Sequence, residues 1–345
     1  MDRDDRVGDG GAVLSRPGGR SSSRLDEDDV RVRPGRGSRP RTRTRPRHAD
    51  APSGLVTTVD RGRYAVLVED RRVTAVQARE LGRRSVVVGD RVAVVGDVSG
   101  DADTLARIVR VEPRTTVLRR SADDGDENER VIVANADQLV VVTALADPPP
   151  RTGLIDRCLV AAYVGGLDPL LCLTKADLAP PDELLAAYAD LGVPAVTTQR
   201  GADLAALTDR LAGRTSVLVG HSGVGKSTLV NALVPDADRA TGDVSAAGRG
   251  RHTSSSAIAL PLPDGGWVID TPGLRSFGLG HVTPEALLAA FPDLAEGAED
   301  CPRNCQHRSA EEGCRLDGYV ASGHSTPGRL ESFRRLLAAR AVSDR

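Results

Sequence analysis

Between residues 131 and 280 the chain alternates short apolar runs with longer segments that have apolar residues at helical spacing. The runs are rich in Val and Leu and predict buried strands, and the segments between them predict helices. The expected strands are 138–143, 170–174, 193–197, 216–219, 256–260 and 266–270, and the expected helices are 154–164, 181–191 and 204–211. This alternation predicts a parallel α/β sheet covered by helices on both faces.

A different pattern precedes this region. Short β-rich runs separated by Gly and Asp turns lie at 54–59, 63–68, 85–88, 91–95 and 107–111. Five short strands suit a small Greek-key barrel of the oligonucleotide-binding (OB) type, and an SH3-like barrel suits them as well. RNA binding by such a barrel rests on fold analogy alone.

The remaining segments are polar or helical. The N-terminal tail is poor in apolar residues, which predicts disorder, and its arginines from Arg31 to Arg47 suit either an arm for nucleic-acid phosphates or a solvated tail. The C-terminal end predicts an amphipathic helix whose Arg329, Arg334 and Arg335 could form a basic edge facing RNA. The expected organisation is a disordered tail (1–50), an OB-like β-barrel (51–114), an acidic linker or loop (115–130), a nucleotide domain (131–283) and a helical metal-binding domain (284–345).

Composition narrows the class of protein. Hydrophobic residues make up 40% of the 345 residues, enough for real cores, but aromatic residues make up only 2% and leave little material for stacking on bases. The formal net charge is -2. The sequence has no early apolar run of the secretory kind and no apolar stretch long enough to span a membrane. We therefore expect a cytoplasmic protein without membrane contact.

The stretch after the predicted strand 216–219 carries the clearest chemistry. Its residues 220–227 fit the phosphate-loop pattern G-x-x-x-x-G-K-[ST], and a helix-like run follows. The glycines let backbone N–H groups turn toward phosphates, and the helix N-terminus favours negative charge. Lys226 is expected to bind the β- and γ-phosphates and Ser227 to ligate Mg²⁺. The expected nucleotide-binding residues here are Gly220, His221, Ser222, Gly223, Val224, Gly225, Lys226, Ser227 and Thr228.

Two further motifs extend the predicted nucleotide site, and the second of them points to guanine. Asp270-Thr-Pro-Gly273 follows a predicted strand and fits the D-x-x-G turn, with Asp270 on the Mg²⁺ side and the Gly273 N–H near the γ-phosphate. The second motif resembles the guanine-reading pattern N-K-x-D, in which the carboxylate accepts hydrogen bonds that adenine cannot offer. It consists of Thr174, Lys175, Ala176 and Asp177. Thr174 replaces the usual Asn, which keeps a hydroxyl group and loses an amide.

The order of the motifs is unusual. The guanine motif around Asp177 precedes the phosphate loop, and Asp270 comes last, whereas ordinary GTPases begin with the phosphate loop. This order predicts a circularly permuted GTPase domain. Since the segment after Asp270 leads into residues 285–345, we expect a nucleotide-driven shift to be felt there.

A cluster of Cys and His residues lies near the C-terminus. Cys301, Cys305, His307 and Cys314 offer three thiolates and one imidazole, a closed tetrahedral set of the kind that holds one structural zinc ion. Free thiols are the alternative reading, and His324 is a weaker substitute ligand.

Taken together, the permuted motifs, the barrel and the Cys/His module resemble the ribosome small-subunit-dependent GTPase family. The resemblance runs from about Gly54 to the C-terminus. The stretches that carry it are 86–92, 134–137, 248–253 and 270–277. In the family the first two Cys are usually one residue further apart and the last is one residue closer. The resemblance implies GTP hydrolysis with Mg²⁺, stimulated by the 30S subunit, and binding of its 16S rRNA late in subunit maturation. We expect a monomer.

The stretch 248–253 is a candidate switch. Thr253 is the expected hydroxyl that senses Mg²⁺ and the γ-phosphate, with Ser254 as substitute. Leu274 stands where Ras-type GTPases carry a water-positioning Gln, and an apolar side chain cannot orient water. The expected catalytic residues are therefore Lys226, Thr253 and His252, although His252 also suits a surface or packing role.

Two other functions remain open on the sequence. One is a permuted GTPase that acts on the large subunit or elsewhere, which the flanking modules argue against. The other is a nucleotide-stabilised RNA-binding assembly factor with incidental hydrolysis, which Leu274 would permit.

Overall fold

The structure, a computed structural model, describes residues 48–82, 86–101, 104–121, 129–235, 257–271, 279 and 282–340. All of these belong to one compact unit, and the predicted arginine-rich tail up to Arg47 lies outside the described residues.

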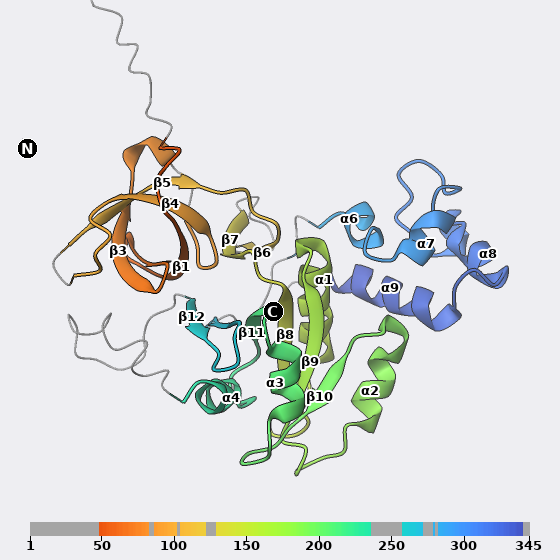
Figure 1. The fold of residues 1–345 in the computed structure, drawn as a ribbon. Helices are drawn as coiled ribbons and strands as arrows, with labels where there is room; N and C mark the ends of the chain where they lie inside the picture. Colours follow the sequence, from red (N-terminus) through yellow and green to blue (C-terminus); the bar gives the residue numbers. More distant parts are fainter. Residues whose placement is uncertain are drawn as a thin grey trace, which may run out of the picture. The chain divides into compact units, whose positions relative to one another are not determined.

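The first part of this unit is a closed five-stranded barrel (Figure 1). Its strands are β1 (Ser53–Asp60), β2 (Arg63–Val68), β3 (Arg71–Gln77), β4 (Arg91–Gly96) and β5 (Ala106–Val111). They pair in the order β1-β2-β3-β5-β4, and β4 returns to β1. The parallel β3–β5 pair requires a crossover that an all-antiparallel meander lacks, which favours the OB-like barrel over the SH3-like one. The barrel has its own apolar core, to which Val56, Val66 and Ile108 belong.

The barrel differs from the sequence prediction at two strands. β3 was not expected, yet its Val73 and Ala75 alternate inward and are fully buried. In place of the expected strand 85–88, the described residues from Val86 onward form a loop in which Val88 makes one isolated bridge to Val133.

A two-stranded hairpin occupies part of the predicted acidic linker. Strand β6 (Val117–Ser121) pairs antiparallel with β7 (Glu129–Ala134), and the acidic residues between them lie outside the described part. Leu118 of β6 and Val133 of β7 are buried in a large apolar core. Their burial explains why the two ends of the predicted acidic linker form strands although the linker as a whole is polar.

The nucleotide domain is built on five parallel strands in the order β10-β9-β8-β11-β13. They are β8 (Gln138–Ala144), β9 (Asp168–Thr174), β10 (Ala195–Thr197), β11 (Thr215–Val219) and β13 (Trp267–Asp270). Strand β12 (Ile258–Pro261) departs from the predicted parallel sheet, because it runs antiparallel to β13. β12 also pairs with β1 of the barrel through Thr58 and Ile258, and Ile258 in turn lies opposite Asp270.

Helices cover both faces of this sheet, as the alternation predicted. They are α1 (Thr152–Gly165), α2 (Asp182–Tyr188), α3 (Ala205–Leu211) and α4 (Lys226–Leu233). Val141 of β8 packs in one core with α1 and α2, while its neighbours Val140 and Val142 pack in a second core with α3 and α4. The alternation follows because successive strand residues point to opposite faces.

The C-terminal part adds four helices to the first of these two cores. They are α6 (Pro284–Leu288), α7 (Pro292–Gly297), α8 (Leu316–Ala321) and α9 (Pro327–Ala339). The Thr283 and Thr326 hydroxyl groups accept hydrogen bonds from backbone N–H groups at the starts of α6 and α9, which fixes where both helices begin. Phe291 and Phe333 are fully buried and lie in the same core as α1.

The last helix is the ordinary amphipathic helix that the sequence predicts first, and its arginines bind groups of the protein itself rather than forming the secondary alternative of a free basic edge. Arg329 binds the Asp293 carboxylate and the carbonyl groups of Asp190 and Leu191. Arg335 binds the Ala187 carbonyl group, and Arg334 turns toward the Cys/His cluster. These arginines are engaged within the protein because the apolar face of α9 is packed against α1, which brings its flanks against neighbouring helices.

Candidate nucleotide and metal sites

The phosphate loop connects β11 to α4, as predicted. A Cβ atom on Gly220 would lie 2.4 Å from the Val142 carbonyl oxygen. Because this distance is a steric clash, only glycine fits at position 220. Gly223 and Gly225 have φ angles of +86° and +91°, the left-handed region that a phosphate cradle requires. Ser227 is exposed in the first turn of α4, where a bound nucleotide can reach it.

Lys226 and Asp270 lie together at the end of the sheet. The Lys226 ammonium group donates to the Asp270 carboxylate, and their side chains are 13% and 25% exposed. Strand register brings them together, because Leu218 of β11 lies opposite Asp270 of β13. The Thr271 hydroxyl group donates to the Leu218 carbonyl oxygen at 2.8 Å and fixes the chain just after Asp270. The amine predicted to bind phosphate and the carboxylate predicted on the Mg²⁺ side therefore share one location.

The guanine-reading segment follows β9 at the same edge. Lys175 has a φ angle of +58° and donates through its ammonium group to the Asp147 carbonyl group. The Ala176 N–H group donates to the Thr198 carbonyl oxygen at 3.2 Å, and Asp177 is exposed. A non-glycine residue held at positive φ marks a backbone that its surroundings constrain, which suits a base-reading loop.

Thr174 contacts the phosphate loop directly. Its buried hydroxyl group donates to the Val224 carbonyl oxygen at 2.6 Å. Thr174 stays a predicted nucleotide contact, and in the structure its hydroxyl group joins the predicted guanine-reading segment to the phosphate loop. The carboxyl ends of β9, β11 and β13 thus bring three sequence segments together in spite of their permuted order.

Several predicted residues lie outside the described part of the chain. They are His252, Thr253, Ser254, Gly273 and Leu274.

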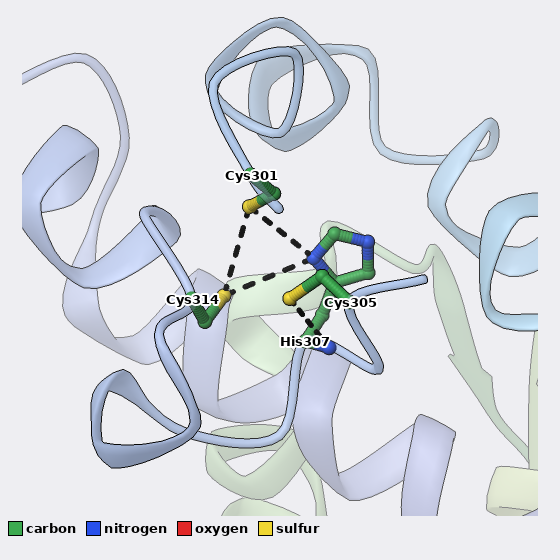
Figure 2. A group of neighbouring side chains, drawn as sticks. All are labelled: Cys301, Cys305, His307 and Cys314. Carbon is green, nitrogen blue, oxygen red and sulfur yellow. Dashed lines mark hydrogen bonds between the residues drawn. The ribbon is translucent and has the colours of Figure 1, made fainter. Parts of the chain in front are cut away.

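The four predicted metal ligands lie together in the C-terminal part (Figure 2). Cys301 Sγ lies 3.7 Å from His307 Nδ1 and 4.0 Å from Cys314 Sγ, and Cys314 Sγ lies 3.8 Å from His307 Nδ1. All four candidate ligand atoms, including the Cys305 sulfur, lie within 4.8 Å of one another. A tetrahedral zinc ion with Zn–S bonds of about 2.3 Å needs neighbouring sulfurs about 3.8 Å apart. The set therefore fits one tetrahedral metal ion.

The electrostatics of these side chains also favours metal binding. Burial raises the pKa of the Cys314 thiol to about 11, and the neighbouring Cys301 and Cys305 thiols contribute to the rise. Three thiolates in one small space repel one another, and a divalent cation relieves this repulsion. Burial lowers the pKa of His307 and so favours the neutral imidazole, the form that binds metal.

Two stretches that carried the family resemblance have a structural role that the sequence analysis missed. The Asn135 side chain accepts from the Thr115 N–H group at 2.9 Å and donates to the Gly89 carbonyl oxygen at 2.9 Å. The fully buried Asp90 accepts from Arg114 at 2.7 and 2.8 Å. Stretches 86–92 and 134–137 therefore join the barrel to the nucleotide domain. The left-handed φ angle of Asn135 (+54°) gives no signal in a sequence, since Asn also serves in many exposed turns.

The phosphate loop, the paired Lys226 and Asp270 and the guanine-reading segment, in this chain order on one parallel sheet, define a circularly permuted P-loop GTPase. Residues 111–280 match the family model described as RsgA GTPase. A "Small ribosomal subunit biogenesis GTPase RsgA" of Gemmatimonas aurantiaca is 41% identical over 262 residues, which cover 74% of this chain and 84% of the relative. The protein of the same name from Chlorobaculum parvum is 37% identical and covers 83% of this chain and 97% of its own. The chain belongs to the RsgA GTPase family and is a GTP-hydrolysing enzyme.

Solved structures agree with this assignment. The crystal structure of YjeQ from Thermotoga maritima superposes with a TM-score of 0.62 at 26% identity and covers 84% of this chain and 98% of its own. YloQ, described as a circularly permuted GTPase, superposes with a TM-score of 0.60 at 25% identity and covers 86% of this chain and 97% of its own. The predicted family, fold class and enzyme class are confirmed. Among the described residues, no helix combines the length and the apolar character needed to cross a membrane.

Proposed function

We propose that this enzyme hydrolyses GTP to GDP and phosphate during late maturation of the small ribosomal subunit, and that the 30S particle stimulates it. The supporting observation is the convergence of the phosphate loop, Asp270 and the guanine-reading segment at one sheet edge. The chain that carries this site is related over most of its length to proteins named for small-subunit biogenesis. Its OB-like barrel suits contact with 16S rRNA, and we propose a monomer that acts in the cytoplasm, where ribosomes are assembled.

The chain's own residues suggest how the site works. Lys226 and the backbone N–H groups of the phosphate loop bind the β- and γ-phosphates, and Asp177 accepts hydrogen bonds from guanine. Ser227, Thr253 and Asp270 would hold Mg²⁺, and the ion would supply positive charge beside the phosphate oxygens. Gly273 senses the γ-phosphate, and His252 orients the attacking water in place of the apolar Leu274. Slow intrinsic turnover follows, because Leu274 cannot orient water and the 30S particle is needed to complete the site.

We propose that Cys301, Cys305, His307 and Cys314 bind one structural zinc ion. The distances among these four side chains support this. A structural role follows because four protein ligands fill a tetrahedral site and leave no position for water or substrate. Zinc would hold together a C-terminal part in which three of the helices, α6, α7 and α8, are short.

The decisive experiment measures GTP hydrolysis by the full chain alone and with added 30S, 50S or 70S particles, with ATP as the nucleotide control. We expect strong stimulation by 30S particles and no ATP hydrolysis. Stimulation by 50S particles alone would assign the enzyme to the large subunit. A response to no particle would overturn the ribosomal assignment.

Two variants test the site residues. Lys226→Ala should lose nucleotide binding, because the ammonium group is the main cation at the phosphates. If assembly function survived in this variant, a nucleotide-independent RNA-binding factor would replace the GTPase switch. Asp177→Asn should lose GTP and gain xanthosine triphosphate, because the amide can donate to the 2-oxo group of xanthine. Retained GTP affinity in Asp177→Asn would rule out Asp177 as the guanine reader.

A further inference from the structure

One side chain outside the Cys/His cluster approaches it from helix α9. The Arg334 Nε–H group donates to the His307 carbonyl oxygen at 3.1 Å. The two terminal nitrogens of the same guanidinium group donate to the Asp317 carboxylate at 2.8 and 2.6 Å. Arg334 therefore joins α9 and α8 to the loop that carries His307, and the Asp317 carboxylate fixes the direction of its fork.

The backbone at His307 needs such a contact. His307 has a φ angle of +53°, a conformation that costs a non-glycine residue free energy and persists only where the surroundings hold it. This conformation turns the ring so that Nδ1 lies 3.7 Å from Cys301 Sγ and 3.8 Å from Cys314 Sγ (Figure 2). The hydrogen bond from Arg334 grips the peptide unit that follows the strained φ angle. The Phe333 ring, at 6.4 Å from the His307 ring, supports it from the same helix.

Charge gives the same residue a second role. A divalent metal ion with three thiolates and a neutral imidazole has a net charge of -1, and the site is partly withdrawn from water. An excess negative charge in such surroundings is stabilised by a nearby cation. The Arg334 side chain is only 23% exposed, so solvent screens its charge incompletely.

We infer that Arg334 is a positioning residue for the metal centre, which holds His307 in its ligating conformation and offsets the negative charge of the Cys₃His site. The inference rests on the zinc assignment proposed above. It links metal affinity to α9, the helix whose other arginines bind the nucleotide domain.

The test measures zinc affinity of the full chain by competition with a chromophoric chelator, together with the visible spectrum of the cobalt-loaded protein. Arg334→Gln should bind zinc about 10- to 100-fold more weakly, the range typical for loss of a residue that orients a metal ligand. Its cobalt spectrum should change, because the His307 ring is free to turn. Arg334→Lys keeps the charge and loses the fork, so an intermediate affinity would separate the two roles.

The matched control is Arg335→Gln. Arg335 neighbours Arg334 on α9 but binds the Ala187 carbonyl group and pairs with Asp156, so its loss loosens α9 without touching the cluster. Zinc affinity in Arg335→Gln should stay within about twofold of the parent protein. If Arg334→Gln does not fold, Asp317→Asn frees the fork while keeping the arginine's charge, and its cobalt spectrum should change because the His307 ring is less firmly held.

Three results would overturn the inference. They are an unchanged affinity and cobalt spectrum in Arg334→Gln, an unchanged cobalt spectrum in Asp317→Asn when Arg334→Gln cannot be prepared, and an equal loss of affinity in Arg335→Gln. A parent protein that folds without binding zinc would remove the zinc assignment and this inference with it. The parent protein's own metal content therefore separates the two failures, and neither bears on GTP hydrolysis.

Discussion

The barrel and the C-terminal helices are attached to the nucleotide domain in different ways. Phe333 of α9 and Leu159 of α1 lie in one continuous apolar core, so within the described part of the chain the C-terminal helices have no core separate from the nucleotide domain. The barrel keeps its own core around Ile108 and meets the nucleotide domain through hydrogen bonds of Asn135, one pair of β1 and β12 residues and the apolar Val59 and Val88. The Asp90–Arg114 ion pair lies on the barrel side and holds the loop that makes these contacts.

The difference shows two ways to add a module to a GTPase. A shared apolar core makes two regions unfold together, because neither can lose its partner without exposing apolar surface. A polar joint between two separate cores allows each side to keep its structure when the joint is weakened. We therefore expect the barrel to move as a body more readily than α9.

The largest expected effect comes from Phe333→Ala. Phe333 is fully buried with its ring 5.3 Å from the Phe291 ring, and its truncation should cost about 3–5 kcal/mol of unfolding free energy. Because the core is shared, amide exchange should rise in α1 as well as in α9. The matched change in the barrel core, Ile108→Ala, should raise exchange in the barrel strands and leave α1 protected. Unchanged exchange of α1 in Phe333→Ala would show that the two regions are separate after all.

Asp90→Ala should come next, at about 3 kcal/mol. The change leaves Arg114 and the Val87 N–H group without the carboxylate that both bind. Arg114 is 22% exposed and can regain part of its hydration, which keeps the cost at the lower end of the range. Limited proteolysis should show a loosened barrel joint with α1 and α9 intact. The exposed pair of Arg71 and Glu69 offers the control, since Arg71→Ala should leave both stability and the joint unchanged.

Asn135→Ala should have a smaller effect on the same joint, about 1–2 kcal/mol. It removes the acceptor for the Thr115 N–H group and the donor for the Gly89 carbonyl oxygen. Asn135→Asp keeps the acceptor and should fall between the two in chemical denaturation. Equal stability of all three proteins would mean that the joint depends on Val88 and β1 rather than on this side chain.

The smallest effect is a pH dependence at the α9 interface. Burial raises the pKa of Asp156 above its ordinary value, and the nearby Arg335 and Tyr188 only partly oppose the rise. The folded state therefore binds this proton more tightly than the unfolded state, and the cost of the buried carboxylate disappears as pH falls from above the raised pKa toward the ordinary value near 3.8. Unfolding free energy of the parent protein relative to Asp156→Asn should rise over that fall in pH.

Asp293 of α7 pairs with Arg329 of α9 and gives the opposite sign at the same interface. Burial raises its pKa, but hydrogen bonds from Arg329 and Ser325 outweigh this and lower the pKa overall. Its contribution is present above the ordinary value and is lost as pH falls through the lowered one. Parent stability relative to Asp293→Asn should therefore fall with acidification, and slopes of the same sign for both variants would contradict this account.

The sequence predicted those parts of the fold that depend on local pattern. The five parallel strands were predictable because each contains an apolar run, and the OB-like barrel was one of two predicted types. Strand β3 escaped because Arg71, Arg72 and Gln77 mask the alternation of Val73 and Ala75. The direction of the α9 arginines also escaped, because Arg329 and its partner Asp190 are 139 residues apart in the chain.

The candidate sites divide in the same way. The glycines of the phosphate loop and the Cys/His set could be predicted, because their chemistry fixes the residue types over a few positions. The partner of Thr174 could not, since Val224 reaches it only when two distant strands are paired with β8 between them. The same holds for Arg334 and His307, which lie 27 residues apart and meet only when α9 has packed.

The position of Ile258 has a consequence for any ligand of the barrel. Ile258 lies between Thr58 of the barrel and Asp270 of the nucleotide site. Two inter-strand spacings, about 10 Å, therefore separate the backbone of barrel strand β1 from the backbone of β13 at Asp270. Coupling between two binding equilibria is reciprocal. Suppose that the pairing of β1, β12 and β13 differs between the GTP-bound and the GDP-bound enzyme. A ligand of the barrel then raises the affinity for one nucleotide by the same factor by which that nucleotide raises the affinity for the ligand. Replacement of the nucleotide would then weaken binding of the ligand, and release of the ligand would weaken binding of the favoured nucleotide.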